Sequence, residues 1–134
     1  MKDRYILVAG CILGGLGVAL GAFGAHWLKG AVQQWGLEPA EQINRLATWE
    51  VAVRYQMYHA LALLVIGLLA SRAVSRCLVW SACLFIIGTT IFSGCLYAFT
   101  LSGVKILGAI VPIGGTCLMA GWIVLAISVW KRRD

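Results

Sequence analysis

The chain has 134 residues, of which 61% are hydrophobic and only 12% are charged. Because soluble domains are close to half apolar and a quarter charged, this composition excludes an ordinary water-soluble domain and indicates a membrane protein. The length suffices for one domain, which we place over residues 1–134. A net charge of +6 would indicate a nucleic-acid ligand in a soluble protein. Here the basic residues flank apolar runs, so we predict a lipid bilayer as the surroundings and no nucleic-acid partner.

The first hydrophobic run, residues 5–28, carries glycines at alternating spacings of four and three residues. On a helix they form one continuous stripe of packing positions: Gly10, Gly14, Gly17, Gly21 and Gly24. A second stripe lies beside it and consists of Gly15, Ala19, Ala22 and His26. Stripes of small residues allow membrane helices to approach closely, so that van der Waals packing holds them together. We therefore predict that this is the central helix of a small bundle, with three neighbours packed around it.

Three further apolar runs follow, and each is long enough to cross a bilayer. A polar connection ends in Gly36, and Pro39 then stands at a position typical of the first turn of a helix. From Pro39 the pattern stays helical to about residue 71, and its amphipathic first third is predicted to lie at the membrane surface. The predicted spans are residues 5–28, 51–70, 77–101 and 106–130. The predicted fold class is all-α: a polytopic membrane protein with four transmembrane helices in a compact bundle and an interfacial amphipathic helical segment before the second span.

Four spans put both termini and the middle turn on the same side of the membrane. Basic residues are concentrated on that side, which holds Lys2, Arg4, Arg72, Arg76, Lys131, Arg132 and Arg133. The opposite side holds Lys29, Arg45, Arg54 and Lys105. Because cytoplasmic loops carry an excess of Lys and Arg, we predict a multi-pass protein of the bacterial inner membrane with both termini in the cytoplasm.

Polar side chains inside the apolar runs gather toward the outer half of the bilayer. We single out seven residues as candidate ligand-binding positions: His26, Tyr55, Gln56, His59, Ser93, Tyr97 and Pro112. Tyr55, Gln56 and His59 share a helix face, because they lie three or four residues apart. An ionisable group at membrane depth is costly and usually points into the bundle. We therefore expect these groups to converge beneath the outer loop.

This convergence has a structural and a functional interpretation. In the structural one, neutral histidines bond to Tyr, Gln or Ser and lock the helices together, as polar residues between membrane helices often do. In the functional one, the site holds a small ligand, a metal, or a haem between His26 and His59, since imidazole suits iron and copper. Two histidines alone form a weak metal signature, so the sequence does not identify a cofactor. Pro112 has no N–H for the Gly108 carbonyl, so it is predicted to kink the fourth helix or to leave that carbonyl free to bind.

The sequence contains no supported catalytic constellation. None of the predicted spans contains Asp or Glu, whereas a proton pump or secondary transporter usually has a carboxylate within the membrane. The glycines of the first run follow no strand, so they do not form a nucleotide-binding loop. We therefore do not predict an enzyme.

Several stretches together resemble a known family. They are Gly21-Ala22-Phe23-Gly24-Ala25-His26, the block from Ala52 to Leu61, Phe92-Ser93-Gly94 with Leu96-Tyr97, and Pro112-Ile113-Gly114-Gly115 with Gly121-Trp122. In this order they resemble the family of small bacterial inner-membrane proteins of unknown function that includes eukaryotic transmembrane protein 256. The resemblance covers nearly the whole chain. It implies four spans, and it implies no established activity, substrate or catalytic residue.

The leading functional hypothesis is a non-enzymatic accessory or structural membrane component that works through helix contacts. Its partners are then other membrane proteins or further copies of the chain. One alternative is a small homo-oligomeric transporter or channel, although the inner half of the predicted bundle is almost entirely apolar. The other alternative is a haem-, copper- or quinone-binding membrane protein that uses His26 and His59.

Overall fold

A computed structural model describes residues 2–131, and within this range the only regular secondary structure is helical. The elements are α1 (Lys2–Phe23), the π-helical turn η1 (Gly24–Leu28), α2 (Lys29–Gln34), α3 (Pro39–Arg72), α4 (Arg76–Ser102) and α5 (Ile106–Trp130). Four helices are long and apolar enough to cross a membrane, and the first of them runs without a break from Asp3 to Gln34. The predicted all-α membrane class is confirmed.

Local sequence signals explain where the helices begin and end. Gly36 has a φ of 68°, a left-handed conformation that suits glycine, and it closes the first helical segment. The hydroxyl of Ser75 accepts a hydrogen bond from the amide of Leu78 and caps the start of α4. Gly103, with a φ of 72°, ends α4 by donating its amide to the carbonyl of Phe99. The two turns that join α3 to α4 and α4 to α5 are therefore short.

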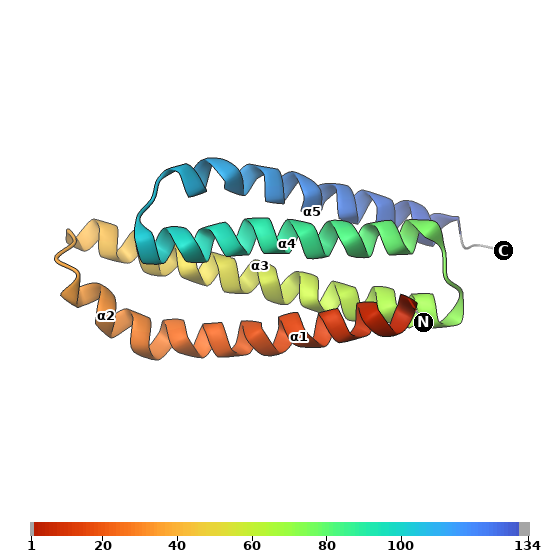
Figure 1. Ribbon diagram of the computed structural model, residues 1–134, viewed down its shortest axis with the longest axis horizontal. Helices are drawn as coiled ribbons and strands as arrows, with labels where there is room; N and C mark the ends of the chain where they lie inside the picture. The colour runs from red at the N-terminus through yellow and green to blue at the C-terminus, as the bar shows by residue number, and fades with distance from the viewer. Residues whose placement is uncertain (1, 132–134) are drawn as a thin grey trace.

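The helices lie in a row in the order α1, α3, α4, α5 (Figure 1). α1 packs on α3 and touches α4 only slightly, and α5 packs on α4. The prediction that the first helix is the central helix is therefore wrong, because α3 and α4 form the centre of the row. A glycine stripe allows a close approach but does not set the number of neighbours, and here all five glycines face α3.

The glycine stripe of α1 allows large side chains of α3 to reach the backbone of α1. A Cβ on Gly17 would lie 2.5 Å from the sulfur of Met57, and a Cβ on Gly24 would lie 2.5 Å from the indole of Trp49. Gly10 lies in the same way against Leu64, whereas Gly14 and Gly21 have more room. The second stripe faces away from the other helices, since Gly15, Ala19, Ala22 and His26 are all exposed.

A separate set of glycines brings α5 against α4. A Cβ on Gly114 would come within 2.5 Å of the backbone nitrogen of Phe92, and one on Gly121 would come within 2.6 Å of the Phe85 ring. Phe85 is fully buried in the main core, together with Leu63 and Ile66 of α3. These close contacts between α4 and α5 are thus made by glycines for which we predicted no helix packing from the sequence.

Both described ends of the chain and the turn between α3 and α4 lie at one end of the molecule, which we call the terminal end (Figure 1). Arg72 and Arg76 flank the turn there. The other predicted basic residues of this side include Arg132 and Arg133, which lie outside the described residues. α3 has 34 residues and is about 51 Å long at 1.5 Å per residue. A hydrocarbon layer is about 30 Å thick, so part of α3 extends beyond it.

Candidate functional site

His59 of α3 lies at the centre of the polar interior and is only 4% exposed. Its Nδ1 lies 2.7 Å from the backbone carbonyl of Tyr55, and its Nε2 accepts the indole N–H of Trp122 at 3.1 Å. A carbonyl can only accept, so Nδ1 carries the proton and the ring is neutral. Both ring nitrogens are therefore committed, and the imidazole joins α3 to α5.

An open cleft lies beside His59, between α3 and α5, and has a volume of about 560 Å³. It is lined by Tyr55, Tyr58 and His59 of α3, Phe92 of α4, and Pro112, Gly115, Thr116, Leu118, Met119 and Trp122 of α5. We call it the aromatic cleft. The Tyr55 ring packs on Phe92 with centroids 4.7 Å apart, and the Trp122 ring packs on Phe85 at 5.0 Å.

Gln56, Ser93 and Tyr97 form a second polar group that lies away from this cleft. The Gln56 amide donates to the carbonyl of Leu13 in α1 at 2.9 Å, and its oxygen accepts the Tyr97 hydroxyl of α4 at 2.9 Å. The Ser93 hydroxyl donates to the carbonyl of Ala52 at 2.8 Å. These bonds connect α1, α3 and α4. The three side chains act as links between helices, which is the structural interpretation of the polar residues.

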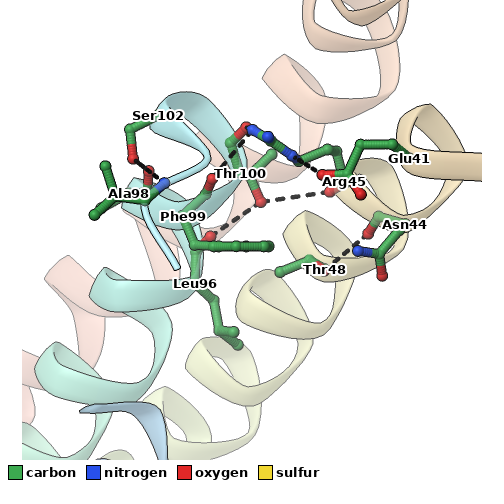
Figure 2. A network of polar contacts seen from close by, with 10 residues as sticks. Glu41, Asn44, Arg45, Thr48, Leu96, Ala98, Phe99, Thr100 and Ser102 are labelled. Carbon is green, nitrogen blue, oxygen red and sulfur yellow. Dashed lines mark hydrogen bonds and ion pairs between the residues drawn. The ribbon is translucent and has the colours of Figure 1, made fainter. Parts of the chain in front are cut away.

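Arg45 forms a third polar group, at the end of the molecule opposite the termini. Its guanidinium donates to the carbonyls of Thr100 at 2.8 Å and Phe99 at 3.3 Å, and its Nε bonds to the carboxylate of Glu41 at 2.6 Å (Figure 2). Carbonyls at the C-terminal end of a helix carry partial negative charge, so the cation caps α4. Glu41 precedes the apolar part of α3, and the adjacent Arg45 lowers the pKa of that carboxyl.

Trp49 links α3 to the π-helical turn in the first segment. Its indole N–H donates to the Leu20 carbonyl at 2.9 Å, and its side chain is only 4% exposed. In a regular α-helix that carbonyl accepts the amide of Gly24, where the turn η1 begins. A side chain that bonds into the helical ladder is a recognised cause of such a distortion. Trp49 is therefore an interior residue.

His26 and His59 are not brought together. His26 lies in η1 and is exposed, and none of the hydrogen bonds or ring contacts in the described part of the chain involves it. Gly24 packs on Trp49, and His59 lies ten residues, or about 15 Å, further along α3. Because a metal–imidazole bond is about 2 Å long, one metal ion or haem iron cannot bind both rings. Among the described residues there is also no group of three His, Cys, Asp or Glu side chains that could hold a metal ion.

Pro112 lies inside α5, which remains helical on both sides of it. Its carbonyl accepts the Thr116 hydroxyl at 2.9 Å, and its ring forms part of the aromatic cleft. Of the seven predicted positions, the structure thus places Tyr55, His59 and Pro112 at the cleft. Gln56, Ser93 and Tyr97 lie in the second polar group, and His26 lies apart from both.

Sequence reasoning missed Arg45, Trp49 and Trp122 as residues whose polar atoms bond from helix to helix. All three are of types that commonly mark the ends of membrane spans, and hydropathy cannot distinguish that role from burial. One signal was available for Arg45: Glu41 lies four residues before it, a spacing that favours an ion pair. No comparable signal pairs Trp122 with His59, because the two are 63 residues apart.

Four long apolar helices and polar side chains that bond from helix to helix define a polytopic α-helical membrane protein. The chain belongs to the protein family of unknown function DUF423, whose model matches residues 20–115. It is 42% identical over 131 residues to a UPF0382 membrane protein of Staphylococcus haemolyticus, covering 98% of both chains. UPF0382 membrane proteins of Staphylococcus aureus and Staphylococcus epidermidis are 39% and 41% identical over 128 residues, which is 96% of this chain and 97% of each relative. No solved structure matches the chain. The predicted membership of a family of small membrane proteins is confirmed.

Proposed function

We propose that this protein is a non-enzymatic structural or accessory component of the bacterial inner membrane and that it acts through contacts between transmembrane helices. The observation that carries the proposal is the open small-residue stripe of α1. Gly15, Ala19 and Ala22 are exposed, and a Cβ on Gly15 would meet no atom within 4 Å. Small residues on a lipid-facing surface allow a further helix to pack closely, as the first stripe does with α3.

The polar interior supports the same proposal. Ser81 donates to the Gly121 carbonyl between α4 and α5, and Ser93 donates to the Ala52 carbonyl between α4 and α3. Gln56 extends this linkage to α1. Polar groups that bond from helix to helix hold a rigid unit together, and such a unit suits a scaffold that presents a fixed outer surface.

The occupant of the open stripe that we propose is a second copy of the chain, since homo-oligomers are the commonest assemblies. The test is Förster transfer between donor- and acceptor-labelled copies in liposomes, for the parent and for Gly15→Leu. The matched control is Gly94→Leu, because Gly94 is also exposed and a Cβ there also meets no atom within 4 Å. We expect transfer in the parent and the control and its loss in Gly15→Leu. Transfer that is absent in the parent, or unchanged in Gly15→Leu, would contradict self-association through this stripe.

We further propose that both termini lie in the cytoplasm. The terminal end of the molecule carries Arg4, Arg72, Arg76 and Lys131, and the positive-inside rule assigns such an end to the cytoplasmic face. A green fluorescent protein fused to the C-terminus should therefore fluoresce, and alkaline phosphatase fused there should be inactive. The opposite pair of results would reverse the orientation.

A further inference from the structure

The aromatic cleft exists because α3 and α5 both pack along α4, while α3 and α5 meet through side chains such as those of His59 and Trp122. Its volume of about 560 Å³ falls within the range of about 300–1,000 Å³ that is usual for small-molecule sites. The lining is mainly apolar and aromatic with a few polar atoms, which is also the usual composition of such sites. This feature is independent of the small-residue stripe of α1, which lies at the other edge of the row.

The cleft lies within the predicted membrane spans. Tyr55 and His59 lie four and eight residues after residue 51, where the second span is predicted to begin, or about 6 and 12 Å along α3. A site at that depth is reached through the hydrocarbon layer, so its ligand must be lipid-soluble.

The chemistry of the lining restricts the class of ligand further. His59 is held neutral by its two hydrogen bonds, and no Asp, Glu, Lys or Arg lines the cleft. A charged headgroup would therefore be buried without a counter-charge, which is costly. The walls are flat rings, and planar rings stack favourably on such surfaces. A flexible acyl chain would not use this feature.

Two hydroxyl donors stand at the cleft and are available to a ligand. None of the hydrogen bonds in the part of the chain that the structure describes involves the hydroxyl of Tyr55 or that of Tyr58. An unpaired hydroxyl in an apolar medium is costly, so a ligand that accepts a hydrogen bond gains from meeting it. We propose that the aromatic cleft binds a lipid-soluble compound whose planar ring carries hydrogen-bond-accepting carbonyls, the chemistry of an isoprenoid quinone headgroup.

The test is quenching of tryptophan fluorescence by decylubiquinone, measured on the full-length protein in nanodiscs. Trp122 lines the cleft, so a bound quinone ring quenches its emission. The blocking variant is Gly115→Leu, in which the added side chain enters the cleft. A Cβ on Gly115 would meet the Phe92 ring at 3.7 Å, an ordinary contact. The matched control is Gly108→Leu on the same helix, where a Cβ meets no atom within 4 Å and which lies outside the cleft.

We expect saturable quenching in the parent and in Gly108→Leu, and only linear collisional quenching in Gly115→Leu. Tyr55→Phe and Tyr58→Phe should each weaken binding by about fivefold for a hydrogen bond lost. Decylbenzene, which has the same tail but no ring carbonyls, should compete poorly. Linear quenching in the parent would overturn the proposal. Equal competition by decylbenzene would also overturn it, because the cleft would then bind apolar chains without regard to the ring carbonyls.

Discussion

The indole N–H of Trp122 donates to Nε2 of His59 across 3.1 Å and joins the two helices that flank α4. With Nδ1 held by the Tyr55 carbonyl, this bond fixes the tautomer of a buried imidazole. The arrangement explains how an ionisable residue can lie within a membrane, since the ring is neutral and both of its polar atoms are paired.

Breaking this bond should destabilise the protein measurably. We expect Trp122→Phe to cost about 1 kcal/mol, because it removes the donor but keeps an aromatic ring beside Phe85. His59→Leu removes the acceptor instead. It leaves the Trp122 N–H without a partner and should also destabilise the protein. Unfolding by titration with dodecyl sulfate measures both, and a double-mutant cycle isolates their coupling, expected at about 0.6–1.5 kcal/mol. A coupling near zero would show that the bond contributes nothing to stability.

Removing the cap on α4 should weaken the end of the molecule opposite the termini. Arg45→Met leaves the carbonyls of Phe99 and Thr100 without their cationic donor, and we expect a loss of about 1–3 kcal/mol. The control is Arg54→Met on the same helix, because Arg54 is 53% exposed and its contact to Glu50 is 3.9 Å long. That change should remain within about 0.5 kcal/mol. Amide hydrogen exchange near residues 99–105 should rise in Arg45→Met alone, and equal effects of the two variants would argue against the cap.

The glycines of α5 should respond differently to the same substitution. Gly114→Ala places a methyl group against the backbone of Phe92, which cannot move aside as a flexible side chain can. We expect a loss of about 1–3 kcal/mol from overpacking. Gly108→Ala meets no atom and removes a helix-weakening glycine, so it should raise stability by about 0.5–1 kcal/mol. Thermal melting in detergent provides the comparison, and a tolerated Gly114→Ala would mean that α4 and α5 pack less closely than described.

Gln56 should matter more than Tyr97, because it bonds to both α1 and α4. Tyr97→Phe removes a single hydrogen bond, and its expected cost is about 1 kcal/mol. Gln56→Met removes that bond and the one to the Leu13 carbonyl, so its cost should be about twice as large. The same dodecyl sulfate titration ranks the two variants. The reverse order would contradict the role of Gln56 as the link among three helices.

Much of the fold could be predicted, because the signals that specify it are local. Apolar run length indicates spans, and Pro39 and Gly36 indicate where helices begin and end. The glycine stripe of α1 indicates a close helix contact, and such contacts occur on α3. The stripe could not show that α1 has a single main neighbour, since the number of neighbours depends on the faces of every other helix.

The candidate site was predictable only in part. Tyr55 and His59 share a helix face by spacing alone, so their common location at the cleft follows from the sequence. The separation of His26 from this cleft does not follow from the sequence, because it depends on the level at which α1 packs along α3. Trp122 is linked to His59 by tertiary packing across 63 residues, and no local pattern carries such information.

The row of helices has a consequence for biosynthesis. Each of the three later long helices packs on the long helix that comes immediately before it along the chain. A nascent segment therefore meets its neighbour as soon as it leaves the translocation machinery, without waiting for later portions to be made. Native contacts that are close in sequence form quickly, so assembly can proceed stepwise during translation.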